Sequence, residues 1–204
     1  IMGLVLDYQD GQTPLDEDEK EGLLIKTITT HTELNEHEQL NIEKAIEWTI
    51  HNHFSAEKIL TESFIKQLHK RMLGEVWAWA GKFRKTEKNI GVPWSKIGIQ
   101  LKYLLDDTLF WIEHETFSPD EIAIRFKHRL VNIHCFPNGN GRHSRVMADI
   151  IVESIFHRPV FTWSNSNMVI GDTTRKTYIT AIQEGDKGDI APLLKFARSG
   201  RQLK

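Results

Sequence analysis

Residues 118–145 of the chain read SPDEIAIRFKHRLVNIHCFPNGNGRHSR. The first half of this stretch predicts a helix, because Ser118 suits the N-cap, proline is preorganised for the first helical turn, and Glu121 completes a capping box. The apolar residues of this helix fall on one face and are Ile122, Phe126, Leu130 and Ile133. An apolar face needs a core to pack against, so we expect this helix to lie at the centre of the protein.

The second half of the stretch predicts an anion-binding loop. Gly139, Asn140 and Gly141 follow the helix and precede a second helix, which we expect over residues 142–156. Glycine lets backbone N–H groups converge, and asparagine tolerates left-handed backbone geometry. N–H groups that converge at a helix N-terminus attract anions, because the positive end of the helix dipole lies there. On its own, a Gly-Asn-Gly sequence is usually only a turn.

Three side chains beside this loop suit a polyphosphate and a proton transfer. Arg142 and Arg145 are three residues apart on the expected helix, so they share a face and suit the β and γ oxygens of a polyphosphate. His134 opens the loop, and its ordinary pKa suits a general base near neutral pH. Each feature alone has a commoner structural explanation. Their coincidence predicts transfer of part of a nucleotide to a hydroxyl that His134 deprotonates.

The rest of the chain predicts an all-α protein with one small β-hairpin. The further expected helices cover residues 35–51, 61–73, 95–114, 173–184 and 189–197. Asn35 as the N-cap and Glu38 at the third helical position form the capping box of the first of these helices. A polar segment over residues 85–94, which contains Gly91 and Pro93, predicts a short hairpin or flap.

The length suits one large domain, or a core domain with a small helical extension, and the composition is close to that of an ordinary soluble protein. The chain has 204 residues, of which 40% are apolar, with 26 Lys and Arg against 28 Asp and Glu and a formal net charge of −2. This balance gives no reason to expect nucleic acid as a direct partner. Cys135 is the single cysteine, which rules out an internal disulfide and favours a reducing compartment. The N-terminal residues show neither a signal peptide nor a membrane span, so we expect a cytoplasmic protein with no membrane partner.

Two other enzyme classes find no support in the sequence. The ten histidines include no His-Glu-x-x-His sequence, which argues against a zinc hydrolase. His51 and His53 lie near the end of an expected helix without a neighbouring carboxylate–His pair. No serine stands in a Gly-x-Ser-x-Gly sequence, which excludes an α/β-hydrolase.

Residues 134–145 resemble the Fic (Fido) motif, whose usual form is His-x-Phe-x-Asp/Glu-Gly-Asn-Gly-Arg-x-x-Arg, and differ from it only at the acidic position. Residues 79–84, WAGKFR, resemble the Trp-Ala-Gly-x-x-Arg segment that precedes the family's flap. The positions that resemble the family's C-terminal helices are Tyr178, Gly188, Asp189 and Pro192. The sequences TPLD at 13–16 and ELNE at 33–36 resemble those of the bacterial subgroup called mobile mystery protein B.

The resemblance implies the Fic fold, a helical bundle with a small β-hairpin flap, and adenylyl transfer, also called AMPylation. In that reaction a Ser, Thr or Tyr hydroxyl of a target protein attacks the α-phosphorus of ATP, and pyrophosphate leaves. By motif position His134 is the base and Phe136 anchors the loop in the core. The residues implied to bind the nucleotide are Gly139, Asn140, Gly141, Arg142, Arg145 and Tyr178. The flap at 85–94 would align the target segment by strand-like backbone pairing.

Asn138 stands where the family has the Asp or Glu that holds Mg²⁺ between the α and β phosphates. A neutral amide oxygen is a weaker ligand for this hard cation than a carboxylate. Three outcomes stay open: slower transfer with the metal held by the phosphates and Asn138, use of a different nucleotide or phosphate donor, or loss of transfer. The competing functions are therefore a non-catalytic nucleotide-binding or phosphate-binding module and a phosphotransferase. The sequence Gly139-Asn140-Gly141 counts against the phosphotransferase, because that variant usually has Ala-Asn-Lys there.

The same resemblance divides the chain into an N-terminal arm with a regulatory segment, residues 1–34, and a Fic-type catalytic domain, residues 35–204. It also implies a helix-turn-helix partner protein. We expect a loose arm to about Gly11, and the acidic run at 16–21 predicts a solvated helix face. Many Fic proteins carry an inhibitory helix with the pattern Ser/Thr-x-x-x-Glu-Gly/Asn, whose Glu pairs with the second motif arginine. Glu21 is the preferred candidate, and the alternative, Glu36, is already explained by its position in a capping box.

Overall fold

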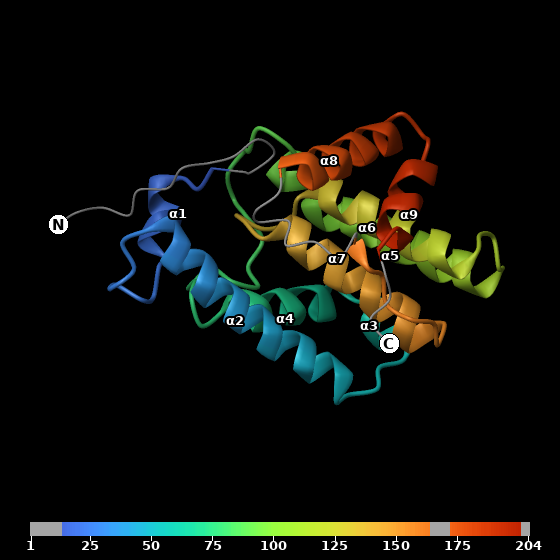
Figure 1. Ribbon diagram of the computed structural model, residues 1–204, viewed down its shortest axis with the longest axis horizontal. Helices are drawn as coiled ribbons and strands as arrows, with labels where there is room; N and C mark the ends of the chain where they lie inside the picture. Colours follow the sequence, from blue (N-terminus) through green and yellow to red (C-terminus); the bar gives the residue numbers. More distant parts are fainter. Residues whose placement is uncertain (1–13, 164–171, 201–204) are drawn as a thin grey trace.

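The computed structural model describes residues 14–163 and 172–200 and is built of helices (Figure 1). In chain order these are α1 (Glu17–Glu21), α2 (His31–Ile50), α3 (Ala56–Ile59), α4 (Glu62–Leu73), the 3-10 helix η1 (Trp94–Lys96), α5 (Ile97–Glu113), α6 (Pro119–Ile133), α7 (Asn140–Ile150), the π-helix η2 (Ile151–Ile155), α8 (Asp172–Asp186) and α9 (Ala191–Arg198). The predicted helical architecture is confirmed. The predicted β-hairpin is absent from this part of the chain, where the only strand-like pairing is an isolated bridge between Leu23 and Trp77.

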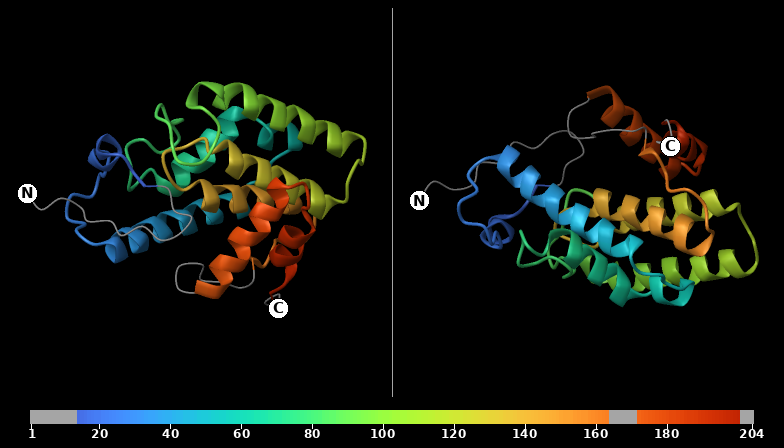
Figure 2. Two further views of the ribbon diagram at one scale, coloured as in Figure 1. Left: turned by 90° about the horizontal axis from the view of Figure 1, so that it is seen from above. Right: turned by 60° about the horizontal axis from the view of Figure 1, so that its bottom comes forward.

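Helix α6 occupies the centre of the fold, as its apolar face predicts. It packs against α5, α7 and α9, and the views in Figures 1 and 2 show these helices on different sides of it. Its start also follows the prediction, because the Ser118 hydroxyl accepts a hydrogen bond from the Glu121 N–H at 3.4 Å and a proline fills the first turn. Phe126 is fully buried on its inner face.

Helices α2 and α4 pack against one another, and α4 also contacts α7. The prediction for α4 is confirmed to within one residue, and the Thr61 hydroxyl caps it by accepting from the Phe64 N–H. The predicted start of α2 at Asn35 is wrong, because the helix begins one turn earlier. Thr30 is its N-cap and accepts from the Glu33 N–H at 3.2 Å, while the Glu33 carboxylate accepts from the Thr30 N–H at 3.1 Å. This earlier capping box leaves Glu38 inside the helix.

The C-terminal helices α8 and α9 pack together and cover α6 (Figure 2, left). Their closest approach to α6 depends on Gly185, where an added Cβ would lie 2.7 Å from the His128 ring. His128 Nε2 and Asn132 Nδ2 both lie within hydrogen-bond distance of the Asp186 carboxylate, at 2.9 and 2.6 Å. This polar cluster joins α6 to the end of α8. The helix expected over 142–156 is observed as α7 followed by the π-helix η2.

The described part of the N-terminal segment packs on the core. Leu15, Leu23 and Ile28 are buried in the same apolar cluster as the central helices. Backbone hydrogen bonds run from Leu24 N to Val76 O and from Ala78 N to Gly22 O, each 2.8 Å long. The loose arm expected to about Gly11 lies outside the described residues, and the boundary expected between residues 34 and 35 falls inside α2. In the described ranges no helix combines the length and the apolar character needed to cross a membrane.

Candidate active site

The loop between α6 and α7, residues 134–139, is braced from within. Phe136 is fully buried, and its ring stacks on that of His69 with centroids 3.7 Å apart. The Asn140 side chain accepts from the Phe136 N–H at 2.9 Å and donates to the Phe136 carbonyl at 2.8 Å. The anchoring role expected of Phe136 is confirmed. The Asn140 side chain serves the loop itself, so its contribution to an anion site would come from its backbone N–H.

The two glycines of the loop have different surroundings. Gly139 is the N-cap of α7 with φ of 77°, and an added Cβ would lie 2.6 Å from Leu73 Cδ1. Only glycine suits that combination of left-handed backbone and close packing. At Gly141 an added Cβ would meet nothing within 4 Å. The first turn of α7 therefore has an open side, where its N–H groups lack intrahelical acceptors and favour an anion.

His69 of α4 contacts the loop at residues 134–139 and was not among the predicted site residues. Its Nδ1 accepts from the Gly81 N–H at 3.0 Å, so its Nε2 carries the proton and donates to the Asn138 carbonyl at 3.0 Å. Burial in the core, reinforced by the neighbouring His143, holds the pKa of His69 well below its ordinary value, so the ring is neutral. Its only sequence signal is a polar residue on the apolar face of α4 beside Leu68.

His134 ends α6 in the left-handed conformation, with φ of 57° and ψ of 61°. This conformation is strained for a residue with a Cβ. The Arg84 guanidinium stabilises it by donating from Nε to the His134 carbonyl at 2.6 Å. Burial, together with the charges of Arg84 and Lys88, lowers the pKa of His134 to about 4, against a hydrogen bond with the Val131 backbone that raises it. The imidazole is therefore neutral at pH 7 and able to accept a proton.

The flap loop, which we define as residues 85–93, lies directly against His134. Gly91 has φ of 101°, and a Cβ at this position would lie 2.6 Å from the Cβ of His134. Arg84 ties the two ends of the flap loop together, because it donates from Nη1 to the Thr86 carbonyl at 2.8 Å and from Nη2 to the Val92 carbonyl. The Val92 N–H donates to the Ile133 carbonyl at 3.4 Å. The structure thus brings the predicted flap and the predicted base together.

The two motif arginines have different partners. Arg142 Nη1 forms an ion pair with Glu38 Oε2 at 2.6 Å, and the other Glu38 oxygen accepts from Trp77 Nε1, also at 2.6 Å. The guanidinium of Arg145 lies over the ring of Tyr178, 5.4 Å from its centroid. The arginines therefore start from one turn of α7 but contact α2 and α8 respectively.

Two expected site residues are placed differently from the prediction. Tyr178 is 7% exposed and its ring contacts Arg145, Lys127 and Phe196. In this position it packs against the Arg145 side chain and offers little exposed surface to a nucleotide. Glu21 is exposed at the end of α1 and forms no ion pair with either motif arginine. The carboxylate that pairs with Arg142 is that of Glu38, a residue whose sequence position predicts a helix cap but which lies inside α2.

The position of Asn138 does not form a protein-held site for Mg²⁺. Its amide oxygen accepts from the Gly139 N–H at 2.5 Å, and its backbone carbonyl accepts from His69. A neutral oxygen that is already hydrogen-bonded lacks the charge that this cation prefers. Across residues 14–163 and 172–200, no three His, Cys, Asp or Glu side chains are grouped to hold a metal ion. The Cys135 thiol is unreactive, because burial raises its pKa to about 12.

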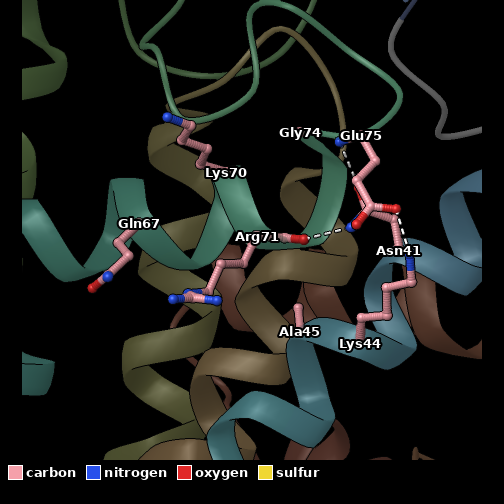
Figure 3. Close-up of a pocket in the computed structure, with 8 residues that line it drawn as sticks. All are labelled: Asn41, Lys44, Ala45, Gln67, Lys70, Arg71, Gly74 and Glu75. Atoms are coloured by element: carbon pink, nitrogen blue, oxygen red, sulfur yellow. Dashed lines mark hydrogen bonds and ion pairs between the residues drawn. The ribbon is translucent and has the colours of Figure 1, made fainter. Parts of the chain in front are cut away.

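A hollow of about 430 Å³ lies between α2 and α4 (Figure 3). It is lined by Asn41, Lys44, Ala45, Gln67, Lys70, Arg71, Gly74 and Glu75. Asn41 spans its floor, donating to the Arg71 carbonyl at 2.7 Å and accepting from the Glu75 N–H at 2.9 Å. These bonds join α2 to the end of α4, and none of the predicted site residues lines the hollow.

Comparison with known proteins agrees with the all-α fold. Residues 59–152 match the model of the Fic/DOC family. The protein adenylyltransferase Fic of Aedes aegypti is 26% identical over 175 residues, which cover 84% of this chain and 32% of that protein. The protein of the same name from Drosophila melanogaster is 28% identical over 176 residues, covering 84% and 33%. The chain thus spans about a third of the length of these curated relatives.

Solved structures show the same fold. Fic-1 from C. elegans matches with a TM-score of 0.66 at 23% identity, over 87% of this chain and 51% of that one. BepC from Bartonella tribocorum, solved with bound AMPPNP, matches with a TM-score of 0.66 at 15% identity, over 93% and 100%. The match to the Fic/DOC family model and these structures agree on the fold and on the part of the chain, residues 59–152, that carries the resemblance. The mobile mystery protein B subgroup is not singled out, and the bacterial origin stays a prediction because the curated relatives named above are insect proteins.

Proposed function

We propose that this chain transfers AMP from ATP to a Ser, Thr or Tyr hydroxyl of a target protein. Two observations support the proposal: the first turn of α7 has an open side at Gly141, and a neutral His134 begins the short loop that leads into that turn. The match of residues 59–152 to the Fic/DOC family model supports it as well. The relatives named protein adenylyltransferase Fic support the same reaction class. Nucleotide binding is supported by the BepC structure, whose fold this chain shares.

In the proposed reaction the chain's residues position the reactants and move one proton. N–H groups of the first turn of α7, with Arg145, would bind phosphate oxygens. The target hydroxyl oxygen forms a bond to the α-phosphorus, the bond from that phosphorus to the bridging oxygen breaks, and pyrophosphate leaves. The hydroxyl proton passes to His134, which is neutral at pH 7. The neutral amide at Asn138 does not suit a protein-held metal, so these steps rest on the chain's own residues.

The flap loop would align the target segment through its backbone, because it lies directly on His134. The helix-turn-helix partner implied by the family resemblance belongs to this proposal, and so does the cytoplasmic location expected from the N-terminal sequence. So does the division of the chain into a regulatory N-terminal segment and a catalytic domain.

We further propose that Glu38 takes the regulatory role first considered for Glu21. Its carboxylate is almost buried and neutralises Arg142 at 2.6 Å, so a polyphosphate would have to displace it to use that arginine. The pair therefore restrains nucleotide binding until α2 shifts. The amide at Asn138, a weaker ligand for Mg²⁺ than a carboxylate, favours the second candidate function, a nucleotide-binding module without transfer.

Incubation with ATP labelled at the α or the γ phosphate separates the candidates. Label on protein from the α position supports AMP transfer, and label from the γ position supports a phosphotransferase. Saturable binding of nucleotide without transfer supports the binding module. His134→Ala should abolish transfer, whereas His114→Ala, which changes an exposed histidine at the end of α5, should leave it unchanged.

A further inference from the structure

Lys88, in the middle of the flap loop, is buried among acceptors of the N-terminal segment. Its side chain is 3% exposed. Its Nζ lies 2.6 Å from Glu19 Oε2, 2.9 Å from Asp16 Oδ2 and 3.3 Å from the Pro14 carbonyl. An ammonium group has three protons to donate, so this set of acceptors uses all of them. The acidic run at 16–21 is therefore more than a solvated helix face, because two of its carboxylates hold a buried cation.

The acceptors on the N-terminal side are themselves fixed. Glu19 Oε2 also accepts from the Asp16 N–H at 2.9 Å, and the Glu19 carbonyl accepts from Trp79 Nε1 at 3.0 Å. The opposite oxygen of Glu19 accepts from the Thr86 hydroxyl of the flap loop at 3.4 Å. Gly22 packs on Trp79, where an added Cβ would lie 2.7 Å from the ring. The carboxylates thus belong to a segment that is held against the core.

The flap loop is consequently attached at both ends and in its middle. Arg84 holds its ends, at Thr86 and Val92, and the same guanidinium holds the His134 carbonyl. Lys88 holds its middle to residues 14–19. A loop attached only at its ends keeps conformational freedom between them, and a third attachment removes it.

We infer that Lys88, Asp16 and Glu19 form a latch that keeps the flap loop in one shape against His134, which makes Lys88 a positioning residue. The role follows from geometry: a nearly buried ammonium joins the middle of the loop to a fixed segment far away in sequence. The consequence for the target protein rests on the proposed function, because a flap loop with a preset shape lowers the entropy lost when a target segment docks on it. The latch itself does not depend on any transfer reaction.

Amide hydrogen exchange of the full chain tests the latch without reference to activity. The reporters are the Val92 N–H, bonded to the Ile133 carbonyl, and the Arg84 N–H, bonded to the Cys135 carbonyl. Lys88→Met keeps the aliphatic stem and removes the charge, and we expect exchange at Val92 to become at least tenfold faster. Unchanged exchange at Val92 would overturn the inference.

Three further variants separate a latch from general destabilisation. Lys85→Met makes the same charge change at an exposed position of the same loop and should leave exchange at Val92 unchanged. Lys88→Arg can still reach both carboxylates and should restore most of the protection. Glu19→Gln should accelerate exchange at Val92, and the double variant with Lys88→Met should be no faster than the faster single variant, because both remove one shared interaction. Additive effects, or acceleration by Lys85→Met, would contradict the latch.

A spectroscopic measurement on His134 gives a second readout. The charge of Lys88 helps to hold the pKa of His134 low, together with burial and Arg84. Lys88→Met should therefore raise the midpoint of the His134 ring titration followed by NMR, while Lys85→Met leaves it in place. Faster exchange at Val92 in Lys88→Met without α-label transfer in the wild type would refute the proposed function and leave the latch standing.

Discussion

Glu38 Oε2 lies 2.6 Å from Arg142 Nη1, across 104 residues of sequence. The carboxylate is 6% exposed and the guanidinium 31% exposed, so the pair is partly shielded from water. The other carboxylate oxygen is fixed by Trp77. The first motif arginine is thus neutralised in this conformation, which leads to the first prediction.

Glu38→Gln should strengthen nucleotide binding. The glutamine oxygen can keep the bond from Trp77 while the charge that competes with phosphate for Arg142 is removed. We expect the Kd for AMPPNP, measured by calorimetry, to fall about tenfold, which corresponds to ~1.4 kcal/mol. Glu36→Gln and Glu21→Gly change exposed acids and should leave the Kd unaltered. Equal affinity in Glu38→Gln and the wild type would show that the ion pair does not oppose nucleotide binding.

Asn138→Asp should increase Mg²⁺-dependent transfer. One aspartate oxygen can keep the bond from the Gly139 N–H, and the other adds the negative charge that a hard cation prefers. Transfer of α-label should rise by about tenfold or more with Mg²⁺ and stay at the wild-type level with a chelator. A rate that is equal in the two proteins at saturating Mg²⁺ would mean that Asn138 does not limit the reaction.

Removal of His69 should destabilise the whole loop. His69→Ala leaves the Asn138 carbonyl and the Gly81 N–H without their partner and removes the ring stacked on Phe136. We expect the free energy of unfolding in urea to fall by about 2–4 kcal/mol. His114→Ala, at an exposed helix end, serves as the control and should change it little. A loss in His69→Ala no larger than that of the control would argue against this bracing role.

The two loop glycines should respond differently to alanine. Gly139→Ala combines φ of 77° with a 2.6 Å approach to Leu73, so thermal denaturation should show a clear loss of stability. Gly141→Ala meets nothing within 4 Å and should fold like the wild type. Because its new methyl group stands on the open side of the first turn of α7, it should weaken AMPPNP binding. Unimpaired binding in Gly141→Ala would place the anion elsewhere.

Stability should fall as the solution is acidified from pH 6.5 towards pH 4. Burial lowers the pKa of both His134 and His143 to about 4, so the unfolded chain binds protons in this range that the folded chain does not. The stability that each histidine contributes is fully present above its unfolded pKa. It is lost as the pH falls from the unfolded pKa towards the folded pKa of about 4, by up to ~1.4 kcal/mol per pH unit for each group.

Asp149 acts in the opposite sense, because burial raises its pKa to about 7. Its folded form holds a proton that the unfolded chain releases above pH 4, so its contribution is lost as the pH rises. Urea titrations at several pH values should therefore show a positive slope in the wild type and a steeper one in Asp149→Asn. A flat profile in both proteins would show that these groups are not neutral in the folded state.

The local sequence pattern was enough to predict most of the helices and the position of the loop between α6 and α7. The start of α6 follows from Ser118 and Glu121, and α4 follows from apolar residues at four-residue spacing, because a helix turn depends on neighbours within four positions. The same logic failed at α2. Its sequence offers two capping boxes in succession, one from Thr30 to Glu33 and one from Asn35 to Glu38, and the earlier one forms. The flap, predicted as a hairpin, is a loop attached through the side chains of Arg84 and Lys88.

The candidate residues of the loop, which are its glycines, its histidine and its arginines, could be predicted from twelve consecutive residues, because the prediction depends only on residue type and short spacing. The partners of those residues could not be. Glu38 reaches Arg142 across 104 residues, His69 reaches Asn138 across 69, and Lys88 reaches Glu19 across 69. Contacts of this kind arise only when the core brings distant helices together, since no local periodicity specifies which buried polar groups will meet.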